Sequence, residues 1–365
     1  MRSGFDRVLG AKSFVLGPEV ERFEQAYADY CGVRHCVGVG NGTDAVELAL
    51  RACGVGAGDE VIAPANTFVA TAEAVLRAGA RLVLADCDDS YLLDPDEVAG
   101  RLTARTRAVL PVHLYGQLAP MKALSDVVGP DVALVEDAAQ SQGATQDGRA
   151  SGSLGRAAAT SFYPGKNLGA YGDAGAVTTD SDEVADRLRA LRNHGGVRRY
   201  EHTEVGVNSR LDGLQAVVLS AKLSRLDRWN EQRRAAAAYY DELLSGLDEV
   251  VRPETVPRNE HVWHLYVIRV PGRDDVLAAL HEAGIGAGIH YPAPVHLVPA
   301  FGFLGYGPGA FPHAERLATE ILTLPLFPGI TTDQQERVVE VVRTALTRVS
   351  TGFPGMPTRR QPGPI

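Results

Sequence analysis

The chain has 365 residues, 45% of them hydrophobic, which is enough material to bury the cores of two globular domains. Its formal net charge of -9 argues against a non-specific nucleic-acid-binding protein, because such proteins need a basic surface to match phosphates. The four cysteines lack zinc-site spacing, and we find neither a signal peptide nor an apolar run long enough to span a membrane. We therefore expect a cytoplasmic protein without a metal site or a membrane partner.

Two elements near the N-terminus lead into a glycine-rich turn. A helix is predicted from Pro18 to the residue before Gly32, because Pro favours the first helical turn and Gly ends helices. A short apolar strand at 35–39 is followed by Gly-Asn-Gly-Thr-Asp at 40–44 and by a helix at 45–51. Free N–H groups at the start of a helix bind phosphate, so this turn is a candidate phosphate site.

Two other interpretations of this turn stay open. Thr43 could simply cap the helix. The motif Gly40-x-Gly42-x-x-Ala45 also fits the dinucleotide-binding fingerprint, with Asp59 and Glu60 about 20 residues further on as ribose ligands. An NAD-dependent dehydrogenase is therefore the main alternative from another class of enzyme.

Strands and helices then alternate along the chain. Strands are predicted at 60–64, 81–85, 108–112 and 132–135, and a helix is predicted at 68–77. This alternation predicts an α/β fold with a mostly parallel sheet, in which ligands bind at the carboxyl ends of the strands.

The acidic pair Glu136-Asp137 follows the last of these strands and so falls at the expected ligand-binding edge. Alternatively, Asp137 and Gln140 mark only a helix start, with Asp137 as the cap and Gln140 reaching back to it. The first interpretation makes Asp137 a functional carboxylate, and the second makes it a structural one.

The most distinctive stretch is Ser-Phe-Tyr-Pro-Gly-Lys-Asn-Leu-Gly-Ala-Tyr-Gly-Asp-Ala-Gly at 161–175, in which Lys166 is surrounded by glycines. Glycines let a backbone approach a bound group closely, and a desolvated lysine becomes nucleophilic toward aldehydes because its pKa falls. A phosphate-binding P-loop is ruled out, because Thr160 replaces its first glycine and Asn167 its Ser or Thr. Taken alone, Lys166 could also be a solvated turn residue.

The parts needed to bind pyridoxal 5'-phosphate (PLP) occur together here: a phosphate-ready helix start, an aromatic ring at Phe68, a carboxylate ending a buried strand and a glycine-bracketed lysine. The chain resembles the DegT/DnrJ/EryC1/StrS family of PLP-dependent sugar aminotransferases from about Gly17 to about Val349. The signatures that carry the resemblance are Gly42–Asp44, Val135–Gln140, Ser161–Gly169 with Gly172–Gly175, Arg192–Gly195 and Gly206–Gln215.

The resemblance implies a role for each matched residue. Lys166 corresponds to the lysine that forms the Schiff base with PLP, and Asp137 corresponds to the partner of the pyridinium nitrogen. Gln140 corresponds to the contact to the ring hydroxyl and Phe68 to the aromatic residue that stacks on the ring. The implied phosphate ligands are Gly42, Thr43, the backbone of Asp44, Ser161 and, from the neighbouring subunit, Asn208. A homodimer with shared active sites is therefore expected.

The resemblance also implies the aspartate aminotransferase-like fold, called fold type I. A large PLP-binding domain is expected at 1–232, including a short N-terminal stub where the family usually has an additional segment. A smaller α+β domain is expected at 233–349. A tail at 350–365 is expected to be flexible, because it is rich in Pro and Gly.

Three elements are expected within the smaller domain. They are a strand at 262–268, a helix at 276–283, and a last helix capped by the pair Thr332 and Gln335.

Substrate contacts are expected from two segments. His290, Tyr291 and His296 lie in a segment that resembles the substrate side of family members acting on nucleotide-linked 3-keto-6-deoxysugars. They could also be ordinary loop residues held between prolines. Arg199, beside Arg198, could neutralise a diphosphate, or both could belong to a solvated surface.

The resemblance thus implies a homodimeric PLP-dependent aminotransferase. We expect it to move an amino group from L-glutamate to the keto carbon, with C3 favoured, of a nucleotide-diphospho-keto-deoxysugar. The same chemistry at C4 or on a keto-cyclitol stays open. The family also contains sugar dehydratases in which histidine replaces the lysine, so Lys166 favours amino transfer.

Overall fold

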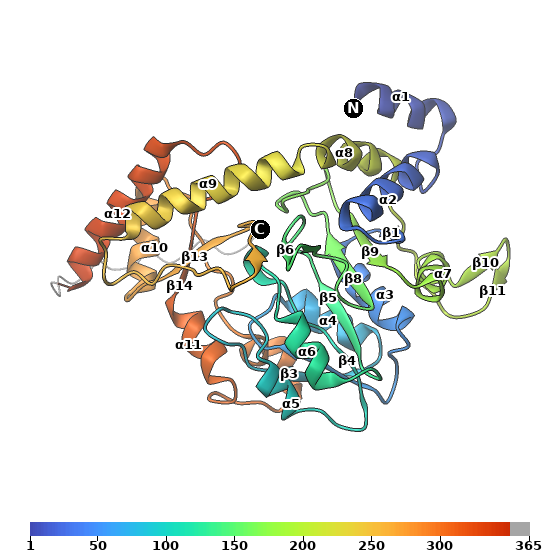
Figure 1. The fold of residues 1–365 in the computed structure, drawn as a ribbon, viewed down its shortest axis with the longest axis horizontal. Helices are drawn as coiled ribbons and strands as arrows, with labels where there is room; N and C mark the ends of the chain where they lie inside the picture. The colour runs from blue at the N-terminus through green and yellow to red at the C-terminus, as the bar shows by residue number, and fades with distance from the viewer. Residues whose placement is uncertain (351–365) are drawn as a thin grey trace.

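The computed structural model describes residues 1–350, and a seven-stranded sheet stands at its centre (Figure 1). In spatial order its strands are β1 (His35–Val39), β9 (Gly175–Thr179), β8 (Ala157–Ser161), β5 (Ala133–Asp137), β4 (Thr106–Val109), β2 (Glu60–Pro64) and β3 (Arg81–Ala85). Neighbouring strands from β8 to β3 are parallel, whereas β9 runs antiparallel to both β8 and β1. The expected mostly parallel α/β sheet is confirmed.

The helices of this region are α2 (Pro18–Cys31), α3 (Gly42–Ala52), α4 (Val69–Arg77), α5 (Pro95–Ala99), α6 (Met121–Val128) and α7 (Asp182–Leu191). Apolar side chains of α3, α4 and α7 share the largest hydrophobic cluster with the strands. As predicted, α2 ends at Gly32, which adopts a left-handed φ of 70°. Helix α3 begins before the expected Ala45, because Asn41 caps it.

The elements that were not expected from the sequence include the strands β8 and β9 and the helix α1 (Arg2–Ala11). Both strands are buried on both faces, so they lack the apolar-polar alternation that signals a half-exposed strand. Helix α1 packs on α8 (Gly213–Leu223), where a Cβ added to Gly4 would lie 2.5 Å from Val217 Cγ1. The expected N-terminal stub is therefore a helix docked on α8.

A second hydrophobic cluster surrounds the far half of the long helix α9 (Leu226–Leu244), which runs from α8 toward α12 in Figure 1. Its other elements are β13 (Tyr266–Arg269), α10 (Arg273–Glu282), β14 (Ile321–Leu324) and α12 (Thr332–Ser350). We propose that this cluster is the core of the expected smaller domain. The expected boundary between residues 232 and 233 falls within α9. Ser350, the first residue of the expected tail, is the last residue of α12, and the rest of that tail, 351–365, lies outside the described residues.

Residues 295–320 return from the second cluster to the large sheet. The short helices η2 (Val295–Leu297) and η3 (Pro299–Leu304) and the helix α11 (Pro312–Glu320) place apolar side chains in the cluster of the large sheet. The Val295 N–H donates to the Ala65 carbonyl at 2.8 Å, directly after β2 ends. This contact ties the segment around residue 290 to the carboxyl edge of the sheet.

Two expectations in the smaller domain are wrong in detail. The strand expected at 262–268 is β13, which begins only at Tyr266, because the preceding residues are drawn to another loop and Val262 donates its N–H to the Gly116 carbonyl at 2.9 Å. The cap of α12 is Thr331 with Gln334, whose side chains and backbone N–H groups bond reciprocally. Gln335 is instead buried and donates to the Ala236 carbonyl at 2.7 Å.

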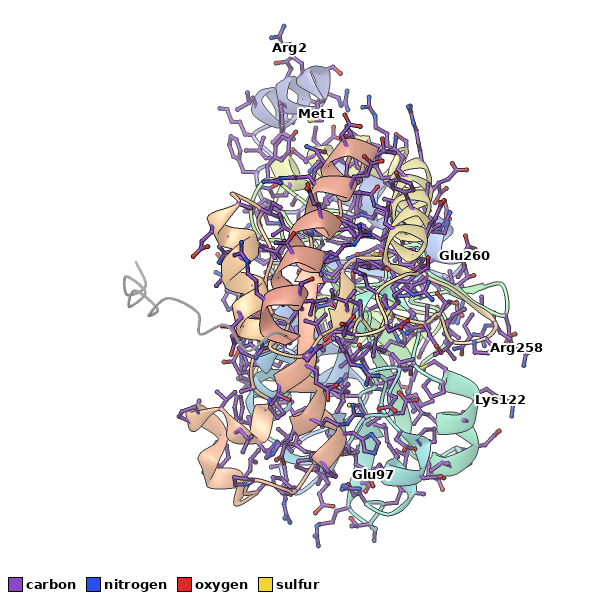
Figure 2. All side chains as sticks on the ribbon, turned by 90° about the vertical axis from the view of Figure 1, so that its left-hand side faces the viewer. Met1, Arg2, Glu97, Lys122, Arg258 and Glu260 are labelled. Atoms are coloured by element: carbon purple, nitrogen blue, oxygen red, sulfur yellow. The ribbon has the colours of Figure 1, made fainter. Side chains whose placement is uncertain are left out.

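The remaining strands form small sheets outside the core: β6 (Thr145–Gln146), β7 (Arg149–Ala150) and β12 (Asn259–Glu260), and the hairpin of β10 (Gly196–Arg198) and β11 (Glu201–His202). The hairpin stands out from the body beyond α7 (Figure 1). Figure 2 shows charged side chains such as Lys122 and Arg258 pointing outward. Within residues 1–350 no helix could cross a membrane, and no group of side chains there could hold a metal ion.

Candidate active site

A cavity of about 880 Å³ opens at the carboxyl edge of the sheet. It brings together most of the expected site residues, namely Gly42, Thr43, Phe68, Asp137, Gln140, Ser161, Lys166, His290 and Tyr291. Four expected residues do not line it: Asp44, Arg199, Asn208 and His296. The cavity therefore joins residues from the starts of α3 and α4, the ends of β5 and β8, and the segment around residue 290.

Asp137 is the last residue of β5 and is only 6% exposed. The Thr71 hydroxyl donates to Asp137 Oδ2 at 2.8 Å, and the Ala139 N–H donates to Oδ1 at 3.2 Å. No helix follows, since residues 138–143 contain two turns and no helical residue, so the hypothesis that Asp137 starts a helix is wrong. The carboxylate is held at the edge of the cavity, where a bound group can meet it.

Lys166 lies in the loop between β8 and β9 and is partly buried. The loop is tight, since a Cβ added to Gly169 would lie 2.5 Å from the Pro164 carbonyl oxygen. Burial lowers the pKa of the Lys166 amine, and the nearby Asp137 charge opposes this shift. The amine is therefore more easily deprotonated than an ordinary lysine, unlike that of a solvated turn residue.

The start of α3 is shaped to receive an anion. Asn41 Oδ1 accepts the Asp44 N–H at 2.9 Å, so Asn41 is the cap and the alternative of a Thr43 cap is wrong. Because the first N–H groups of a helix lack intrahelical partners, those of Gly42 and Thr43 are left for a ligand. A Cβ added to Gly42 would lie 2.5 Å from Ser161 Cβ, so only glycine lets these two elements meet.

Asp44 does not line the cavity, and its side chain bonds to residues around the start of α3. Its carboxylate accepts from Ser209 Oγ at 2.7 Å and pairs with Arg77 at 2.8 Å. Its N–H, the implied phosphate ligand, is already bonded to Asn41. Of the implied phosphate ligands from this chain, Gly42, Thr43 and Ser161 line the cavity, whereas the Asp44 N–H already has a partner.

The dinucleotide alternative is wrong in geometry. Glu60 begins β2, so it lies at the amino edge of the sheet, opposite the start of α3. It accepts hydrogen bonds from Thr103 Oγ1 at 2.6 Å and Arg105 at 2.7 Å. A ribose bound at the glycine turn cannot reach a carboxylate on the other edge.

Aromatic and amide groups form the middle of the cavity. The rings of Phe68 and Tyr291 lie 5.2 Å apart between centroids. Gln140 Oε1 accepts the Tyr115 N–H at 2.6 Å, and its Nε2 donates to the Tyr291 hydroxyl at 3.2 Å. These bonds fix the amide so that its NH₂ group faces the cavity. Burial raises the pKa of Tyr291, so its hydroxyl stays protonated.

Two histidines that line the cavity are held neutral. Burial, helped by the charge of Lys166, lowers the pKa of His290 and places that of His264 well below its ordinary value. His290 Nδ1 bonds to Thr323 Oγ1 at 2.8 Å, and His264 Nδ1 bonds to Asn167 Oδ1 at 3.1 Å. Their rings can therefore accept or donate hydrogen bonds without adding charge.

His296 does not have the expected role. It is 3% exposed, its Nε2 bonds to Glu315 Oε1 at 2.9 Å, and its ring packs on Phe311 with centroids 4.8 Å apart. The side chain thus links η2 to α11 and does not line the cavity. The interpretation of His296 as a substrate contact is corrected accordingly.

Two other expected residues lie on the surface. Arg199 is in the turn of the β10–β11 hairpin, with its guanidinium 5.1 Å from the Tyr200 ring centroid. Asn208 is exposed and pairs through its backbone with Asn193. Neither residue lines the cavity of its own chain.

Sequence reasoning missed several residues that line the cavity: Thr67, Thr71, Tyr163 and His264. Tyr163 lies within the recognised lysine stretch and was the easiest to find. The others carry no motif, because their position depends on α4 and on the chain preceding β13 meeting the end of β5.

A partly buried lysine facing a buried strand-end carboxylate, beside an open helix start, defines an α/β enzyme of the fold type I class. The chain belongs to the DegT/DnrJ/EryC1/StrS aminotransferase family, whose family model matches residues 2–343. It is accordingly an aminotransferase.

Three comparisons, one with a sequence relative and two with solved structures, illustrate this membership. The dTDP-3-amino-3,4,6-trideoxy-alpha-D-glucose transaminase of Streptomyces venezuelae is 46% identical over 345 residues, which cover 94% of this chain and 91% of that protein. The crystal structure of S. venezuelae DesV in complex with a ketimine intermediate has a TM-score of 0.90, with 46% identity and coverage of 94% and 93%. The structure of NtdA from Bacillus subtilis with bound cofactor PMP has a TM-score of 0.87, with 32% identity and coverage of 94% and 81%.

Substituting Gly42 tests the anion site. In Gly42→Ala the new Cβ would lie 2.5 Å from Ser161 Cβ, so we expect PLP to bind at least about tenfold more weakly. The measurement is a titration of apoenzyme with PLP. Gly10→Ala is the control, since an added Cβ there has no described atom within 4 Å. Equal affinities in the two variants would contradict the site.

Proposed function

We propose that this chain is a PLP-dependent transaminase that transfers an amino group from L-glutamate to C3 of a nucleotide-diphospho-keto-deoxysugar. The observation that carries the proposal is the amine of Lys166, with its lowered pKa, in one cavity with the buried carboxylate of Asp137. The preference for C3 is supported by the similarity to the S. venezuelae transaminase. Four buried, unpaired cysteines fit our proposal of a cytoplasmic protein.

The cavity fits PLP group by group. Gly42 lets the start of α3 come close to Ser161, and the N–H groups of this helix start together with Ser161 would hold the phosphate. Phe68 offers a ring face to the cofactor ring. The Gln140 NH₂ group, oriented by the bonds to Tyr115 and Tyr291, could donate a hydrogen bond to the ring hydroxyl. When bound, PLP supplies an electron sink for the substrate carbon.

Asp137 and Lys166 divide the proton chemistry. A carboxylate that faces the ring nitrogen keeps a proton on it, because the opposite charges stabilise each other in a partly buried site. Lys166 would hold the cofactor in the resting enzyme, and its free amine would take a proton from the substrate carbon and return it. Its lowered pKa favours the neutral amine that this task requires.

Charge in the cavity supports a dimeric site. Among the described lining residues the only cations are Lys166 and Arg77, and Arg77 already pairs with Asp44 and Glu47 at 2.8 Å. A nucleotide diphosphate and the carboxylates of glutamate need further positive charge. We propose that a second copy of the chain supplies it through Arg199, on its projecting hairpin, and that Asn208 of that copy contacts the cofactor phosphate.

Reduction with borohydride tests the central claim. Purified protein should be yellow, and borohydride should bleach it and leave a pyridoxyl group on Lys166, because reduction fixes the lysine that holds PLP. Peptide mapping by mass spectrometry locates the label. Recovery on another lysine would refute the proposed function, and Lys222 offers a natural comparison since burial also lowers its pKa.

Replacing Asp137 by Asn tests its role. The variant should still bind PLP, but turnover should fall about a thousandfold or more, because the ring nitrogen loses the charge that keeps it protonated. Steady-state kinetics with glutamate and a keto-sugar nucleotide measure the effect. Near-normal turnover would mean that Asp137 is structural only.

A mixed dimer tests the shared site. Lys166→Ala homodimers should be inactive, and Asn208→Ala homodimers should retain PLP poorly. A heterodimer of the two variants has one site with both changes and one with neither, so it should regain about half the normal activity if the sites act independently. Differently tagged, co-expressed chains allow its isolation. A heterodimer no more active than the Asn208→Ala homodimer would show that Asn208 does not cross the interface.

A further inference from the structure

A pair of buried hydroxyls stands behind the carboxylate of Asp137. Thr71, in the first turn of α4, is 1% exposed, and Thr67, just before that helix, is 2% exposed. Their Oγ1 atoms lie 2.8 Å apart, and Thr71 Oγ1 lies 2.8 Å from Asp137 Oδ2. Both residues also line the cavity.

The direction of these hydrogen bonds follows from the chemistry of the groups. A carboxylate only accepts, so the Thr71 hydroxyl donates its single hydrogen to Asp137. Thr71 Oγ1 can then only accept from Thr67, so Thr67 donates to Thr71. The two hydroxyls form a one-way chain that ends on the carboxylate, and each bond polarises and strengthens the next.

This chain leaves Asp137 with one orientation. Thr71 bonds one carboxylate oxygen and the Ala139 N–H bonds the other, so the carboxylate plane cannot turn without breaking a hydrogen bond. Phe68 lies between Thr67 and Thr71 in sequence, and its ring lines the same cavity. The segment 67–71 thus supplies both Phe68, which would stack on the cofactor ring, and Thr71, which orients the Asp137 carboxylate toward the ring nitrogen.

We propose that Thr71, supported by Thr67, is a positioning residue that holds Asp137 as a correctly aimed carboxylate for the ring nitrogen of PLP. The proposal rests on the PLP function proposed above. Thr71 touches neither the cofactor nor the substrate in this role, and acts only through Asp137. Serine should replace it, since serine keeps the hydroxyl, whereas the isosteric valine should not.

The test is a double-mutant cycle read out by PLP affinity and by the visible absorption of bound PLP. Thr71→Val should weaken PLP binding about tenfold and shift the absorption, because a charge-assisted hydrogen bond is lost. Thr71→Ser should stay within about twofold of the parent, and Thr67→Val should show a smaller loss in the same direction. In an Asp137→Ala background, Thr71→Val should cause no further change in either measurement.

The outcomes separate this inference from the proposed function. The role of Thr71 would be overturned, with PLP chemistry left intact, by either of two results. One is that Thr71→Val weakens PLP binding equally in the Asp137→Ala background, and the other is that Thr71→Ser does not retain the PLP affinity of the parent. Failure of the unmodified protein to bind PLP through Lys166 would instead refute the proposed function. Thermal unfolding of the apoenzymes controls for folding, and Thr67→Val tests the chain if Thr71→Val is unstable.

Discussion

The site depends on the burial of two adjacent carboxylates at the end of one strand. Consecutive residues of a strand point to opposite faces, so Glu136 and Asp137 enter different surroundings. A buried charge is costly unless it is paired or hydrogen-bonded. Each carboxylate therefore requires its own set of donors, and these donors tie distant segments of the chain to β5.

The buried charge of Glu136 is stabilised entirely by groups of the protein. It is fully buried, bonds to His113 Nε2 at 2.8 Å, and accepts the N–H groups of Gly152, Leu154 and Gly155 at 2.7–2.9 Å. Burial by itself raises its pKa, but the hydrogen bonds and the histidine lower it overall. Both carboxylate oxygens of Glu136 are hydrogen-bonded within the protein, so this side chain stabilises the sheet. Asp137 has fewer donors and keeps one side toward the cavity, which is what a cofactor partner needs.

The second hydrophobic cluster is connected to the carboxyl edge of the large sheet through contacts with backbone groups. Arg233 of α9 is buried, pairs with no carboxylate among residues 1–350, and donates to the carbonyls of Trp263, His264 and Leu326 at 3.0–3.3 Å. Burial lowers its pKa to about 10. The turn η1 (Leu114–Gly116) meets this segment so closely that a Cβ added to Gly116 would lie 2.8 Å from the His264 N–H nitrogen. These contacts place His264 in the cavity.

The amino-acid sequence by itself determined the alternation of strands and helices as far as residue 135, the mostly parallel sheet, the family, and the candidates Lys166 and Asp137, because periodicity and contiguous motifs are local properties. It misjudged the caps of α3 and α12 by one or two residues, since several neighbouring polar side chains could serve. Only the tertiary structure decided that Thr71 meets Asp137, that His264 lines the cavity and that His296 is buried. Those outcomes depend on the packing of elements far apart in the chain, and no local pattern encodes which distant surfaces will meet.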